Sequence, residues 1–209
     1  PFGRVRDRYA LWPPLVPLLG GVVLALLIVI IPSDYLGLSL PTMERALHGE
    51  PMSYLGFLWK ALLVAITLGS GFYGGIVTPQ FVIGAVLGGA FAHLLGLPPA
   101  LGAAVGLVAV VASASNTPIA AIFMGVELFG ADSTLYVAGA CVAAYLVIGH
   151  RSVYPAQQIA FSKSSWMFAR ANVPVGQEKI GLSYGLLRWW SERRRAASRP
   201  KARDKDERK

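Results

Sequence analysis

The segment of this chain best suited to bind an ion is the glycine-rich run from Gly69 to Pro79, which reads GSGFYGGIVTP. An apolar stretch follows Pro79, so the run stands at the predicted start of a helix. A helix N-terminus has unpaired N–H groups and roughly half a positive charge, and it can hold an anion without a cationic side chain. The same glycines also suit a tight turn and close packing between two helices. The residues alone leave both interpretations open.

Two side chains elsewhere in the apolar part of the chain could take part in ion chemistry. Tyr154 carries a hydroxyl donor, although a tyrosine at a membrane interface is the more common role. Glu127 is an ionisable residue in an apolar segment, where a charge costs about 2.5 to 3.5 kcal/mol at the membrane centre, so it needs a partner or a pathway. Because Gly130 and Asp132 follow closely, we expect Glu127 near the interface and favour structural pairing over a proton relay.

Other chemistries lack the residues that they require. One Cys and three scattered His cannot make a familiar metal-ligand spacing. The sequence contains no Walker loop, no dinucleotide fingerprint and no serine-hydrolase elbow. We therefore expect no metal, no cofactor and no enzymatic activity.

The composition indicates that membrane helices position these candidate residues. Of the 209 residues, 55% are hydrophobic and 14% are charged, against about 25% charged in an average soluble domain. The mean hydropathy is +0.54. Between Ala61 and Gly149 there is no Lys or Arg, and the only acidic residues are Glu127 and Asp132. A water-facing surface of that length would need more charge.

The apolar segments differ in length. Two long runs, 11–31 and 52–69, are predicted to span the membrane as helices. Lys60 interrupts the second run, and we expect it to snorkel or to face protein. The later segments are short and divided by Gly and Pro, which predicts tilted or half-spanning helices: 79–97, 99–114, 118–129, 133–148 and 155–168.

Small and capping residues make the packing of these helices more specific. Thr78-Pro79 and Thr117-Pro118 are predicted helix starts, each with a capping threonine at or near the first-turn proline. The small-residue runs 88–90 and 102–104 allow helix backbones to approach closely. Cys141 cannot form an intramolecular disulfide because it is the single cysteine, and we expect it to pack as a small residue.

Most of the net charge of +8 comes from the C-terminal end of the chain. Ten of the nineteen basic residues lie at or after Arg188, together with only four acidic residues. Next to membrane segments, this indicates a cytoplasmic end that can contact anionic lipid heads rather than a nucleic-acid surface. With Arg4, Arg6 and Arg8 before the first helix, it predicts that both termini are cytoplasmic. We expect residues 169–209 to form a basic, partly disordered tail.

Three segments, in order, resemble the CLC family of chloride channels and anion/proton antiporters. Segment 75–79, GIVTP, resembles the family's GxFxP motif, and a helix of similar pattern follows it. Segment 114–127 resembles the family's short helix that ends in an acidic residue. Segment 149–154, GHRSVY, resembles the junction that carries an anion-coordinating tyrosine. Together the resemblance covers about residues 4–168.

The resemblance implies an all-α polytopic membrane protein of tilted and discontinuous helices. Residues 1–168 would form the second of the two inverted repeats in a subunit. It implies that a chloride or similar monovalent anion is bound by the loop and the tyrosine, through Gly75, the backbone amides of Ile76 and Val77, and the Tyr154 hydroxyl.

The same resemblance implies partners and a location. The family's serine-containing loop and glutamate gate lie in the first repeat and have no counterpart here, so we expect this half to need an N-terminal half. The chain begins at Pro1 without an initiator Met, which fits a start within a longer protein. We expect a homodimer surrounded by lipid in a bacterial inner or plasma membrane.

Two alternatives to chloride transport remain open. Segments 78–79, 116–118 and 149–151 resemble the fluoride/proton branch of the family, although that branch often has an acid where this sequence has Ile76. The chain could also be a structural or interaction subunit that keeps the fold without transport. Whether a complete protein is a channel or a proton-coupled exchanger depends on acids outside this chain.

Overall fold

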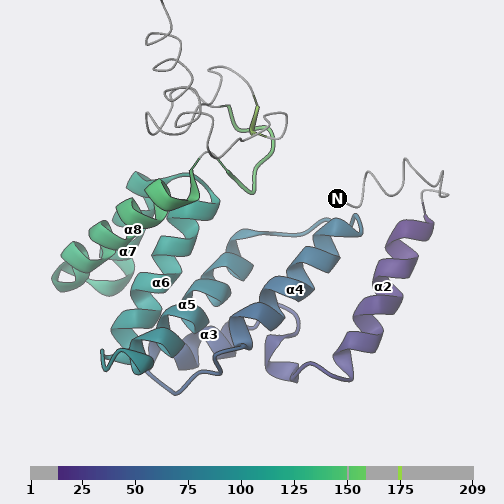
Figure 1. The fold of residues 1–209 in the computed structure, drawn as a ribbon, viewed down its shortest axis with the longest axis horizontal. Helices are drawn as coiled ribbons and strands as arrows, with labels where there is room; N and C mark the ends of the chain where they lie inside the picture. The colour runs from purple at the N-terminus through teal and green to yellow at the C-terminus, as the bar shows by residue number, and fades with distance from the viewer. Residues whose placement is uncertain (1–13, 150, 159–173, 176–209) are drawn as a thin grey trace, which may run out of the picture. The chain divides into compact units, whose positions relative to one another are not determined.

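The computed structural model describes residues 14–149, 151–158 and 174–175, in two units, Pro1–Ile148 and Gly149–Lys209. The regular structure described in the first unit is helical (Figure 1). In chain order, its elements are α2 (Leu15–Ile28), η1 (Ser33–Tyr35), α3 (Leu40–Leu47), α4 (Gly56–Gly69), α5 (Val77–Leu94), α6 (Pro99–Ala114), α7 (Pro118–Phe129), η2 (Ala131–Ser133) and α8 (Thr134–Ile148).

The longer helices alternate in direction along the chain (Figure 1). α5 packs on α4 and α6, α6 packs on α7 and α8, and α3 lies against both α5 and α6. Because the direction alternates, α5 begins, α6 ends, α7 begins and α8 ends at one end of the bundle. We call this the loop end, and it carries Ile76, Ser115, Pro118 and Ile148.

The contact between α5 and α6 is made by glycines that face one another. A Cβ on Gly84 would lie 2.5 Å from the Gly106 carbonyl oxygen, and one on Gly102 would lie 2.6 Å from the Gly88 carbonyl oxygen. A Cβ on Gly88 or Gly106 would overlap the backbone of the other helix in the same way. Only glycine therefore fits at these four positions. The predicted close approach of the two small-residue runs is confirmed where Gly88 meets Gly102.

The core continues from α6 into α7 and α8. Gly125 leaves room for Val137 and Val108, which a Cβ at that position would crowd. Cys141 is fully buried in the same cluster, as expected for a small packing residue. The outward faces of α7 and α8 carry exposed apolar side chains such as Ile119 and Leu135, which suits lipid or another membrane protein as the neighbour.

Lys60 faces protein, which was one of the two roles expected for it. It is 2% exposed, and its Nζ donates to the Tyr35 carbonyl oxygen at 3.2 Å, the Gly37 carbonyl oxygen at 2.5 Å and Ser39 Oγ at 2.9 Å. All three N–H groups of the ammonium therefore have acceptors. A buried cation is tolerated only when it is paired or hydrogen-bonded in this way. Lys60 thus holds the segment between α2 and α3 against α4.

The short helices match the predicted segments better than the long runs do. The predicted helices 99–114 and 118–129 coincide with α6 and α7, and 133–148 differs from α8 by one residue. By contrast, the runs predicted to span the membrane form α2 and α4 of 14 residues each within the described chain. In that same part, the helices of spanning length are Val77–Leu94 and Ala131–Ile148.

Two further predictions need correction. Helix α3 was missed, because it has only eight residues and lies in the charged, proline-containing stretch between the two long apolar runs. The helix predicted from Pro155 is wrong at its start, since residues 155–158 form a turn and an isolated bridge from Gln158 to Pro174. Residues 159–168 and the predicted boundary at 168 lie outside the described residues.

The glycine contact between α5 and α6 predicts a specific loss of stability. Gly88→Ala should lower the free energy of unfolding by about 1–3 kcal/mol, because the added methyl overlaps the Gly102 carbonyl oxygen. Gly139→Ala in α8 is the matched control, since its Cβ would meet nothing within 4 Å. Thermal unfolding in detergent compares the two. Equal stability of both variants would contradict the close contact.

Candidate anion-binding site

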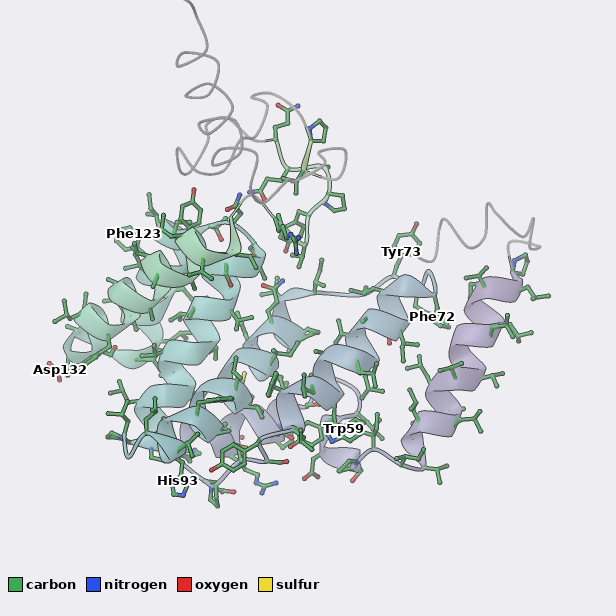
Figure 2. All side chains as sticks on the ribbon, in the orientation of Figure 1. Trp59, Phe72, Tyr73, His93, Phe123 and Asp132 are labelled. Carbon is green, nitrogen blue, oxygen red and sulfur yellow. The ribbon has the colours of Figure 1, made fainter. Side chains whose placement is uncertain are left out.

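A glycine-rich loop separates α4 from α5. α4 ends at Gly69, and Gly71 has a left-handed backbone with φ 90°, which favours glycine over other residues. Residues 71–75 are exposed, and Figure 2 shows Phe72 and Tyr73 at this loop, with Tyr73 projecting away from the helices. The predicted break between two apolar helices is therefore confirmed as a loop whose backbone is accessible.

The first amides of α5 are available as donors. The helix begins at Val77 with Ile76 as its N-cap residue, and its first backbone hydrogen bond runs from the Gln80 amide to the Ile76 carbonyl oxygen at 3.3 Å. Among the described residues, no backbone hydrogen bond is donated by the amides of Ile76, Val77 or Thr78. Such unpaired amides at a helix start form a ready anion site. Three of the predicted site residues, Gly75, Ile76 and Val77, thus lie together there.

The threonines do not cap their helices as predicted. Thr78 lies inside the first turn of α5, one residue after the helix begins. Thr117 does occupy the N-cap position of α7, before Pro118, but its side chain makes no capping hydrogen bond. Both helix starts consequently keep their free amides instead of satisfying them with side chains.

A buried polar contact joins the start of α5 to the junction of α6 and α7. Ser115 Oγ donates to Gln80 Oε1 at 3.1 Å, and the two residues are 7% and 5% exposed. Gln80 Nε2 is also buried and has no partner among the described residues, and neither has Asn116 Oδ1. Asn116 itself adopts a left-handed backbone, φ 62°. An unpartnered buried donor is costly, so this cluster of uncharged polar groups is a specific feature of the loop end.

The sequence analysis missed this pair. Gln80 is a single polar residue in an apolar run directly after Pro79. Its position could have marked it as a candidate buried polar residue. Its partner could not be identified, because Ser115 lies 35 residues away in the sequence.

The donors that the first unit places at the loop end are neutral. No Lys or Arg occurs between Ala61 and Gly149, and the nearest cation before them, Lys60, is fully occupied by its three acceptors. In the part of the chain that the structure describes, no group of three or more His, Cys, Asp or Glu could hold a metal ion. Any anion held here would be bound by backbone dipoles and hydroxyl or amide groups.

Tyr154 belongs to the second unit, which is described by itself. It is 38% exposed, its amide donates to Ser152 Oγ at 3.2 Å, and its carbonyl oxygen accepts from the Gln157 amide at 3.1 Å. The predicted convergence of the Tyr154 hydroxyl with the amides of Ile76 and Val77 stays a prediction.

Glu127 is exposed in the last turn of α7. It forms no ion pair or hydrogen bond with another residue of the described chain. The structural pairing favoured for it therefore has no partner within these residues.

Comparisons with known proteins identify the family of this chain. A family model for voltage gated chloride channels matches residues 2–149. A chloride/fluoride channel protein of Pseudomonas syringae pv. tomato is 42% identical over 168 residues, which cover 77% of this chain and 37% of that protein. An uncharacterized protein of Methanocaldococcus jannaschii is 31% identical over 118 residues, covering 55% of this chain and 30% of the relative.

A solved structure supports the same relationship. The crystal structure of a CLC-type fluoride/proton antiporter superposes with a TM-score of 0.69 at 35% sequence identity, covering 74% of this chain and 39% of that chain. The chain therefore spans between 30% and 39% of the length of the relatives it matches.

The buried contact at the loop end predicts a measurable coupling. Ser115→Ala leaves both polar atoms of the Gln80 amide without a partner, and it should lower the free energy of unfolding by about 1–3 kcal/mol. Ser113→Ala in the last turn of α6 is the control, because Ser113 Oγ bonds only to the Val110 carbonyl oxygen. Adding Gln80→Leu should restore most of the loss, since both polar partners are then gone. Additive losses in thermal unfolding would argue against the contact.

Proposed function

Because the chain belongs to the voltage-gated chloride channel (CLC) family, we propose that it forms the second half of a transmembrane anion transporter whose substrate is chloride. The observation that carries this proposal is the set of free amides at Ile76, Val77 and Thr78 after an accessible glycine loop. An anion bound there meets partial positive charges instead of a full cation. Such a site can bind an ion selectively and still release it, which conduction requires.

In this proposal, Tyr154 belongs to the same anion site. Its hydroxyl donates to the same ion as the amides of Ile76 and Val77, next to the backbone of Gly75. The family resemblance of segment 149–154, GHRSVY, supports this assignment.

The proposed transporter needs more polypeptide than this chain supplies. The chain covers 37% of its Pseudomonas relative, and residues 71–75 of the loop are exposed within it. Non-helical backbone at membrane depth must be buried in protein or line a water-filled cavity. We therefore propose that an N-terminal half covers this loop and that two complete subunits form a homodimer.

Fluoride is the second candidate substrate. Two relatives carry fluoride in their names, one as a chloride/fluoride channel and one as a fluoride/proton antiporter. The donors at the start of α5 are uncharged backbone amides, which can bind either ion. Ile76 is the residue that favours chloride here, because the fluoride branch often has an acid at that position.

The chain is part of a multi-pass membrane protein. We propose a bacterial inner or plasma membrane, with both termini in the cytoplasm. The basic residues before the first helix and after Arg188 support this orientation.

Ion flux through the complete protein tests the proposed site. Tyr154→Phe removes one hydroxyl donor, so anion affinity should fall by a few-fold to about tenfold while the fold is kept. Isothermal calorimetry gives the affinity, and efflux from liposomes gives the rates for chloride and fluoride. Tyr136→Phe, an exposed tyrosine on α8, is the matched control and should leave both unchanged.

Each outcome of the flux experiment decides a separate point. Wild-type affinity and flux in the Tyr154→Phe protein would remove this residue from the site. Fluoride flux without chloride flux would replace chloride by fluoride as the substrate. A complete protein that moves neither ion would favour the non-transporting subunit.

The proposed orientation is tested by cysteine labelling in intact cells. Cys141 is fully buried and gives little background, so a Ser198→Cys variant reports on the C-terminal end. A membrane-impermeant maleimide should modify it only after the cells are opened. Modification from outside would place this terminus on the external side.

A further inference from the structure

A cavity of about 280 Å³ lies between the segment that follows α2, helix α3 and the start of α4. Its polar and aromatic lining consists of Asp34, Tyr35, Thr42, Arg45, Ser53 and Trp59. This volume is at the lower end of the range for small-molecule pockets. The cavity therefore suits a small polar group rather than an extended ligand.

From the sequence around it, we expect the cavity to lie at the boundary between water and lipid. The segment from 32 to 51 contains four charged residues between two apolar helices, α2 and α4. Such a charged stretch lies at the membrane surface, and an interfacial Trp such as Trp59 is typical of that depth. The less polar side of the cavity, formed by Pro32, Pro51 and Met52, suits the start of a lipid chain.

One guanidinium and two carboxylates lie at or beside the cavity. Arg45 Nε donates to Glu50 Oε2 at 2.7 Å, and Arg45 Nη1 donates to Asp34 Oδ2 at 3.4 Å. These bonds use two of the five N–H donors of the guanidinium, so three remain. The hydrogen bond to Glu50 raises the pKa of Arg45, which stays charged. Two carboxylates beside one guanidinium also leave an excess negative charge.

Buried and partly buried hydrogen bonds hold the walls of the cavity in place. Lys60 binds the carbonyl oxygens of Tyr35 and Gly37, and Thr42 Oγ1 donates to the Asp34 carbonyl oxygen at 2.7 Å. The backbone that carries Asp34 and Tyr35 is therefore fixed before any ligand arrives. A preformed site avoids the entropic cost of ordering its walls on binding.

We propose that this cavity binds the zwitterionic headgroup of a phospholipid, with the phosphate at Arg45 and the ammonium between Asp34 and Trp59. An Arg fork matches phosphate oxygens. A carboxylate and an aromatic face together favour an organic ammonium. The acyl chains then run along the apolar helices into the membrane.

Native mass spectrometry of the protein extracted from its native membrane tests this assignment. Short-chain phosphatidylethanolamine should bind saturably and more tightly than phosphatidylglycerol, which has the phosphate but no ammonium. Arg45→Gln should weaken binding of both lipids by about tenfold or more. Asp34→Asn should remove the preference for phosphatidylethanolamine. Glu44→Gln is the control on the same helix, since Glu44 pairs only with His48, at 4.0 Å, and does not line the cavity.

Three results would overturn the proposal. Equal binding of the two lipids to the unmodified protein would exclude a zwitterion site. A loss in Glu44→Gln as large as in Arg45→Gln would point to general surface charge. Free phosphoethanolamine that binds as tightly as the lipid would assign the cavity to a soluble ligand instead. Unfolding midpoints of all variants are measured alongside, and Arg45→Lys, which keeps the charge, should retain part of the binding if Arg45→Gln does not fold.

Discussion

The close backbone contact between α5 and α6 is the constraint on which the rest of the described fold depends. In lipid, helices gain little from hiding apolar surface, so association relies on tight packing and interhelical hydrogen bonds. Gly84 and Gly88 on α5 face Gly106 and Gly102 on α6 with no room for a side chain. This fixes the register of the two helices, and the register brings Gln80 to Ser115 at the loop end.

That register also determines what the loop end can offer to an ion. The free amides of Ile76 and Val77 start the same helix whose position the glycines set. The loop before them is exposed and rich in glycine. It leads into α5, whose register against α6 is fixed by the glycine contacts. Neutral donors on a fixed helix give a site whose geometry does not depend on mobile charged side chains.

Local sequence patterns were enough to predict several helix boundaries. They failed where contacts between residues far apart in the sequence determine the structure. The ends of α6 and α7 follow from prolines and small residues that act within one turn. The short helix α3 was not predicted, because contacts with α5 and α6 stabilise it rather than its own composition. For Lys60, two roles were left open, since its acceptors lie more than 20 residues earlier. The Gln80–Ser115 pair was missed for the same reason.

The short connection between α5 and α6 has a consequence for how the chain acquires its structure. Only residues 95–98 separate the two helices, so closing this hairpin costs little chain entropy. Contacts between neighbours in sequence form quickly, whereas those across many residues are slow. We therefore expect the glycine-faced hairpin to form before the contacts that join distant segments. A substitution at one of these glycines would therefore lower the yield of correctly inserted protein.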